Sequence, residues 1–304
     1  MNSTRLSMRR TSTVFLACFL FLSLDAAIAQ DSPPSSPAAK SGKSVFHRVI
    51  TNQKKTDDAL NLYERLERVE NRKTGSDTKP FEIKTSRVIP GGTGVAHIAV
   101  GPEGEPTDAT AYRAELQKFE KSLTWAAQTG RPQQEAYDKV AKKRKDRDAL
   151  IEAAGSAFIF TFISKEPRDS RTLLKYHMEP DPSFKPTTRT SAVYTKVRGT
   201  VWIDEETGQL AKIEGEVTDD ISVGLFLAKV YKGSHFMQEC YETAPGVWMP
   251  TYSQYDFDGR KFFVSFSIHE RTFYSKYRYI GKPPEALLAI RAELNKSSST
   301  AADR

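Results

Sequence analysis

The segment that decides the fold is RGTVWIDEETGQLAKIEGEV, residues 198–217. Its first part is rich in β-branched and aromatic residues, and Glu205–Gly208 supplies a tight turn. In its second part the apolar Ala211 and Ile213 alternate with polar residues such as Lys212. A period of two residues is typical of a strand with one buried face and one solvent face. The segment therefore predicts two paired strands of an antiparallel sheet.

Strand and turn signals continue on both sides of this segment, from Val193 to Ile280. A long apolar strand is expected at Val223–Tyr231, and Asp258-Gly259 favours a type I′ hairpin. The other expected strands are His235–Glu242, Val247–Phe257 and a last strand that carries Phe262, Val264, Phe266 and Ile268 on one side. The whole region predicts a continuous antiparallel sheet.

The chain before this sheet mixes helical and strand patterns. Asp108 is expected to cap an amphipathic helix, and a second helical segment covers Gln133–Ala154. Between Asp57 and Asn71 the apolar spacing fits both a helix and a strand, with a slight preference for a helix. Further expected elements are a helix behind Ser44, a hairpin at Phe81–Val100, strands at Phe158–Ser164 and Leu173–Met178, and a last helix from Glu285. The fold class is therefore α+β, mainly β, with a helical insertion at about residues 108–154.

The two ends of the chain have different compositions from the middle. Residues 1–29 combine a basic start, the short apolar run Val14–Leu24 and the small-x-small triplet Ala27-Ile28-Ala29, as in a cleaved signal peptide. A retained membrane anchor is the alternative. Residues 30–43 are rich in Ser, Pro and Ala and predict a disordered linker; residues 295–304 predict a flexible tail. The folded domain is expected at residues 44–294, in an exported, periplasmic protein.

The charge balance is mildly basic. The whole chain carries a net charge of +7, and residues 1–29 hold three arginines and one aspartate, so cleavage removes +2 and leaves about +5. This charge is far smaller than that of a typical nucleic-acid-binding domain. We therefore expect no nucleic-acid partner, although a peripheral membrane contact is compatible with the charge.

No local motif for catalysis or metal binding is present. The five histidines lack a ligand spacing such as i, i+4, and no Gly-x-Ser-x-Gly segment occurs. Cys240 is the one cysteine left after cleavage, which excludes an intrachain disulfide. Asp204, Glu205 and Glu206 lie at a turn and are interpreted as solvated charges. We predict no catalytic residue, no metal, no cofactor and no enzymatic activity; a hydrolase assembled from distant residues is a further hypothesis without a motif.

Aromatic and aliphatic residues are concentrated in the expected strands. An apolar sheet face needs either covering helices or a ligand to exclude water. The two alternatives are an ordinary filled core and an apolar binding site. The candidate lining residues of such a site are Trp202, Phe226, Phe236, Trp248, Phe262, Val264, Phe266 and Ile268. A slip of one residue in the face assignment would invert this set.

A run of basic residues marks the second expected helix. Lys142, Lys143, Arg144 and Lys145 follow one another within it. One interpretation is a surface for an envelope partner or for anionic lipid, and the other is a solvated helix face.

The terminal sheet resembles the LolA/LolB-like superfamily, and more closely its outer membrane lipoprotein-sorting protein branch. The residues that carry this resemblance are Val201–Asp204, Thr207-Gly208, Ala211–Glu214, Val247–Pro250 and Tyr274–Tyr277. The resemblance implies a strongly curved antiparallel sheet that forms an incomplete barrel closed by helices. It also implies a helix from Ser44 to about Leu60 and then a strand from Leu62. No ligand-binding residue of the family is transferred by motif.

The resemblance implies a non-catalytic periplasmic protein that binds lipid, a lipoprotein acyl chain or another apolar ligand in the concavity of its sheet. The alternative function is a cell-envelope interaction module with a filled core, which uses its basic helical insertion. The two differ in whether an open apolar space exists beside the sheet.

Overall fold

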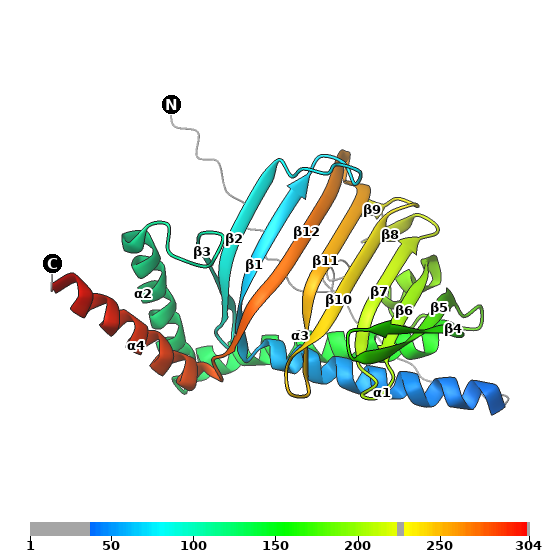
Figure 1. Cartoon of the computed structure of the whole chain (residues 1–304), viewed down its shortest axis with the longest axis horizontal. Helices are drawn as coiled ribbons and strands as arrows, with labels where there is room; N and C mark the ends of the chain where they lie inside the picture. Colours follow the sequence, from blue (N-terminus) through cyan, green and yellow to red (C-terminus); the bar gives the residue numbers. More distant parts are fainter. Residues whose placement is uncertain (1–36, 224–227, 303–304) are drawn as a thin grey trace.

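The computed structural model describes residues 37–223 and 228–302, with side chains for residues 45–222 and 228–296. Its architecture is α+β and mainly β, with a 12-strand antiparallel sheet and helices packed against it (Figure 1). This confirms the fold class expected from the alternating patterns. No helix among the described residues is both long and apolar enough to span a bilayer.

The first strand of the chain lies inside the sheet, third from one edge. The spatial order is β3-β2-β1-β12-β11-β10-β7-β6-β5-β4, and the short β9 pairs with β8 and β11. The strands are β1 (Tyr63–Arg72), β2 (Glu82–Pro90), β3 (Val95–Ala99), β4 (Phe158–Arg168), β5 (Arg171–Pro180), β6 (Val197–Asp204), β7 (Leu210–Val217), β8 (Ile221–Val223), β9 (Ala228–Val230), β10 (His235–Ala244), β11 (Val247–Lys261) and β12 (Val264–Tyr279). Because β1 pairs with β12, the two ends of the domain are joined through the sheet.

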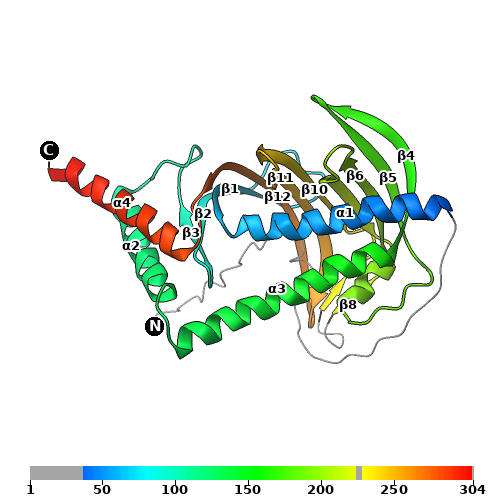
Figure 2. The same ribbon diagram turned by 90° about the horizontal axis from the view of Figure 1, so that it is seen from below.

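Two long helices lie across one face of the sheet. They are α1 (Pro37–Leu60) and α3 (Arg131–Ala157), which run close together in Figure 2. Phe46 and Val49 of α1 are buried in the main core cluster, together with Val201 and Ile203 of β6. The alternation predicted for the β6–β7 hairpin holds for Val201, Ile203 and Ile213, which lie on the side of these helices. Ala211 departs from it, because the pairing shifts between Trp202 and Ile203 and Ala211 packs in another buried cluster with Trp202.

A second core lies at the other end of the sheet. Helix α2 (Ala109–Ala126) packs against α4 (Pro283–Ala302), beside β3. The expected Asp108 cap is confirmed, since its carboxylate accepts hydrogen bonds from the backbone amides of Thr110 and Ala111. The apolar stripe of α2 is buried there with Ile290 of α4. The helical insertion therefore serves both cores, with α2 in one and α3 in the other.

The domain starts with a helix followed by a strand, the order that the LolA/LolB-like resemblance implies. Helix α1 ends at Leu60 and β1 begins at Tyr63, so the ambiguous Asp57–Asn71 region is a helix end followed by a strand. The slight preference for a helix there is wrong for most of the region, because pairing with two neighbouring strands decides it. Helix α1 begins at Pro37, before the expected start behind Ser44.

Two predicted strand boundaries are wrong. The long strand expected at Val223–Tyr231 is replaced by β8 and β9, which pair with each other. No turn forms at Asp258-Gly259, because β12 continues its pairing with β11 past that point and β9 pairs with Gly259–Lys261 of β11. A Cβ at Gly259 would lie 2.2 Å from the carbonyl oxygen of Lys229, so this glycine permits close strand approach rather than a turn.

The sheet is open and is not strongly curled. Its edge strands β3 and β4 lie at opposite ends of the strand order and do not pair with each other (Figure 1). This corrects the strongly curved, incomplete barrel that the resemblance implies. The helices α1 and α3 exclude water from one face, so the sheet needs no closure to bury its apolar side chains.

A partly buried charge network joins the sheet to α2 and α4. The Arg87 guanidinium of β2 donates to Glu64 of β1 at 2.7 Å and to Glu293 of α4 at 2.8 Å. The Tyr112 hydroxyl of α2 donates to the same Glu293 carboxylate at 2.9 Å. Arg278 of β12 also pairs with Glu64, at 2.5 Å. The Arg87 guanidinium of β2 thus contacts side chains of β1, α2 and α4, and Glu64 extends the network to β12.

Replacement of Arg87 should destabilise the domain. Arg87→Met leaves the carboxylates of Glu64 and Glu293 without their central partner, and Glu64 is 9% exposed. We expect a loss of roughly 2–4 kcal/mol in the free energy of unfolding, measured by urea denaturation. The control Arg131→Met removes the exposed Arg131–Glu135 pair and should cost less than about 1 kcal/mol. Equal losses in the two variants would contradict the role of the network.

Candidate functional site

An apolar cavity lies between the helices and the sheet. It has a volume of about 170 Å³ and is partly open to solvent. Helices α1 and α3 contribute Phe46, Val49, Ile151 and Ala154, among others, and the sheet contributes Val201, Ile213, Phe236, Tyr255 and Phe257, among others. The wall is assembled from segments far apart in the sequence. A space of this kind suits an apolar group, because apolar cavities of similar size stay dry and bind small hydrocarbons.

Aromatic rings make one end of the cavity rigid. Phe46 of α1 stacks on Phe160 of β4 with ring centroids 3.5 Å apart, and it meets Tyr176 of β5 edge-on at 5.3 Å. Tyr194 closes the same end, where its hydroxyl donates to the Leu150 carbonyl at 3.0 Å. Burial raises the pKa of Tyr194 above its ordinary value, so this hydroxyl stays neutral. These contacts fix the wall before any ligand enters.

One ion pair interrupts the mainly apolar lining, which also includes Gln53. Asp57 of α1 and Arg147 of α3 both line the cavity, with Nε and Oδ2 2.5 Å apart. The two atoms form an ion pair without hydrogen-bond geometry, and both atoms are buried. Burial raises the pKa of Asp57 from 3.8 to about 6, although Arg147 acts in the opposite direction. The cavity therefore has a titratable group among its apolar residues.

The structure separates the predicted lining residues. Phe236 lines the cavity, whereas Trp202 and Trp248 belong to another buried cluster with Leu173, Ala211 and Cys240. Phe262 and Val264 are exposed, at 52% and 71%. Phe266 and Ile268 are half-buried on β12, where Ile268 pairs with Phe257 of the cavity wall. Phe226 lies outside the described residues.

Strand alternation explains where the tryptophans lie. Val201 faces the cavity, so its neighbour Trp202 points to the opposite side of β6. There its Nε1 donates to Glu166 at 2.8 Å, and the ammonium of Lys175 lies 5.0 Å from the ring. Trp248 lies beneath the guanidinium of Arg171, 5.1 Å from its ring. This outer aromatic cluster is covered by cationic side chains.

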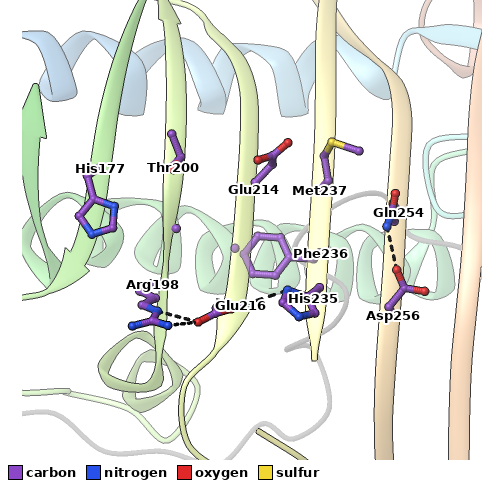
Figure 3. A pocket seen from close by; sticks show the side chains of 12 residues that line it. His177, Arg198, Thr200, Glu214, Glu216, His235, Phe236, Met237, Gln254 and Asp256 are labelled. Carbon is purple, nitrogen blue, oxygen red and sulfur yellow. Dashed lines mark hydrogen bonds and ion pairs between the residues drawn. The ribbon is translucent and has the colours of Figure 1, made fainter. Parts of the chain in front are cut away.

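The outer face of the sheet carries an open polar trough of about 510 Å³ (Figure 3). Its charged groups are paired within the trough or with its border. Arg198 donates to Glu216 at 2.6 Å, and Asp256 accepts from Arg271 at 2.9 Å. Burial alone would raise the pKa of Asp256, but hydrogen bonds from Arg271, Gln254 and His269 lower it. Paired charges on an open surface support the sheet and do not by themselves form a reaction centre.

Among the described residues, no group of three or more His, Cys, Asp or Glu side chains could hold a metal ion. Cys240 is buried, and burial raises the pKa of its thiol to about 12. A thiol of this kind is not a nucleophile at neutral pH.

The basic run lies on the exposed side of α3. Lys142, Lys143 and Lys145 are exposed, whereas Arg144 forms an ion pair with Asp58 of α1. Arg144 thus helps to hold the two helices together. A partner-binding role for the run stays a prediction.

The residues that sequence analysis missed are mostly on the helices and on β11. Val49, Ile151, Ala154 and Tyr255 lie in expected elements, but no local pattern assigns them to one cavity.

Comparisons with protein-family models, with curated proteins and with solved structures find no match to this chain. The function has to be argued from the geometry of the cavity and the surface.

The raised pKa of Asp57 predicts a specific pH dependence. A folded-state pKa above the ordinary value of 3.8 gives stability that is present below about pH 4 and is lost as the pH rises through about 6. The Asp57→Asn variant lacks this titration. Relative to the wild type, its free energy of unfolding should therefore rise by roughly 2–3 kcal/mol between pH 4 and pH 7.

This dependence is measured by urea denaturation of both proteins across that pH range. The carboxyl carbon resonance of Asp57 should titrate with a midpoint near pH 6. A constant stability difference, or a midpoint near the ordinary value, would contradict the buried position of this carboxylate.

Proposed function

We propose that this chain binds an acyl chain or a similar apolar ligand in the cavity between α1, α3 and the sheet. The observation that supports the proposal is the cavity itself, about 170 Å³ in volume and lined almost entirely by apolar side chains. Each buried CH₂ group of a ligand contributes about 0.8 kcal/mol, so binding needs no polar motif. The volume suits a short length of one chain rather than a complete lipid.

The cavity walls favour an apolar group. Phe46 and Tyr194 bound one end, while Tyr255 and Phe257 of β11 lie on the sheet side. The polar pair Asp57 and Arg147 also borders the space, where it accommodates the more polar end of a bound amphiphile. The ligand class that fits best is therefore an amphiphile with one apolar chain.

We further propose that the protein is exported and acts as a LolA-like carrier without catalysis. The supporting features are the signal-peptide pattern of residues 1–29, which lie outside the described residues, and the LolA/LolB-like motifs of the terminal strands. In that family the ligand occupies the interior of a strongly curved sheet. Here the sheet is open, so the proposed site is the covered face between α1, α3 and the strands.

The proposal is tested by filling the cavity. Ala154 lines it, whereas its neighbour Ala153 does not, and both are half-buried on α3. Ala154→Phe should place a ring in the space and lower the affinity for a fluorescent fatty acid at least tenfold. Ala153→Phe adds the same ring outside the cavity and should bind like the wild type. Binding is measured by fluorescence titration, after thermal unfolding has shown that both variants are folded.

The ligand itself is identified by organic extraction and mass spectrometry of the protein purified from a Gram-negative host. A stoichiometric lipid in the wild type and in Ala153→Phe, absent from Ala154→Phe, is the expected result. If the wild type carries no lipid and binds no fatty acid, the proposal is wrong.

A further inference from the structure

The hairpin between β11 and β12 ends in exposed apolar residues. Lys261 pairs with Val264, so Phe262 and Phe263 form a two-residue turn. Phe263 is 100% exposed, Phe262 is 52% exposed and Val264 is 71% exposed. Most apolar side chains of the two cores are buried, whereas the side chain of Phe263 is fully exposed. This hairpin tip, residues 260–264, needs an explanation other than packing.

The backbone of the tip is also unusual. Phe262 has a φ of 56°, in the left-handed region that glycine normally occupies at the first position of such a turn. An aromatic residue in this conformation raises the energy of the folded chain, and a side chain that is 52% exposed recovers only part of that energy by packing. The tip thus departs from two local preferences, because its aromatic residues are exposed and one of them has a positive φ. Such departures are typical of residues that bind something outside the chain.

On one side the tip extends past the neighbouring strand β1. The pairing of β12 with β1 stops at His269, so Val264–Ile268 pair with β11 but not with β1. In Figure 1 the turn between β11 and β12 lies at the upper edge of the sheet, whereas α4 follows β12 at the lower edge. On the other side β9 supports β11 up to Lys261. The turn is therefore held by β11 and β12, with β9 paired along β11 up to the last residue before the turn.

The charged residues within the tip itself, Arg260 and Lys261, are both basic. Arg260 and Lys261 are exposed, and no Asp or Glu occurs between Asp258 and Glu270. The neighbouring Lys229, opposite Arg260 on β9, pairs with Asp220 at 2.6 Å. Exposed aromatic rings next to basic side chains match the two layers of an anionic membrane surface, where rings enter the interface and cations contact phosphate.

We propose that the β11–β12 hairpin tip is a membrane-docking site that inserts Phe262 and Phe263 into the interface of an anionic bilayer. Arg260 and Lys261 then lie at the level of the lipid headgroups. The same strand, β11, carries Tyr255 and Phe257 of the apolar cavity, so docking would bring the cavity close to the lipid. Membrane docking does not depend on the proposed cavity ligand. The docking proposal and the cavity proposal are tested by different variants.

The test is flotation of the purified mature chain with vesicles of equimolar phosphatidylcholine and phosphatidylglycerol. The wild type should float with these vesicles, and less with phosphatidylcholine alone. Phe263→Ser should lower the partition coefficient roughly tenfold, because the ring no longer leaves water. The double variant R260Q/K261Q should bind more weakly and should lose most of the salt dependence.

Two controls separate docking from other effects. Phe162→Ser removes a phenyl group that is 51% exposed on the edge strand β4, and it should float like the wild type. Ala154→Phe, which fills the cavity, should also float normally. If Ala154→Phe loses fatty acid binding but still floats, the result supports a docking site that is independent of the cavity.

The proposal is overturned if the wild type does not float with the anionic vesicles, or if Phe263→Ser floats as well as the wild type. It is also overturned if light scattering shows a wild-type dimer that Phe263→Ser converts to a monomer, since the tip would then contact a second copy of the chain.

Discussion

The pairing of β1 with β12 is the constraint on which the rest of the structure depends. It brings Tyr63 opposite Tyr279, at the start and the end of the domain. Strands β2 and β3 extend the sheet from β1, and β11 and β10 extend it from β12. Helix α1 leads into β1 and α4 follows β12, so the same pairing positions both helices. The Arg87 network then fixes α4 and α2 against this seam.

The sheet divides the molecule into two faces with different chemistry. Helices α1 and α3 cover the face that carries Val201 and Ile213, and the space they leave is apolar. The other face carries paired ions and two tryptophans beneath cationic side chains. Because the cavity on the covered face is lined mainly by apolar side chains and the trough on the outer face by polar and charged ones, an apolar ligand is favoured in the cavity rather than in the trough.

Strand β11 links the two proposed functional features. Its middle part supplies Tyr255 and Phe257 to the cavity wall, and its end supplies the basic residues of the hairpin tip. Gly259, between them, allows β9 and β12 to approach closely on both sides. Strand β11 is therefore continuous from the cavity to the tip.

The sequence alone determined the elements that depend on local chemistry. Alternation in residues 198–217 predicted β6 and β7, and Asp108 predicted the start of α2, because side-chain periodicity and capping act between neighbours. Tertiary structure decided what depends on distant pairing. It extended β11 past Asp258-Gly259, placed Trp202 on the face opposite Val201, and gathered Val49, Ala154 and Tyr255 around one space. The register of a strand decides which of its side chains face the helices, and a slip of one residue would reverse that choice. Contacts between segments far apart in the chain set both this register and the positions of the helices, so no local pattern predicts either.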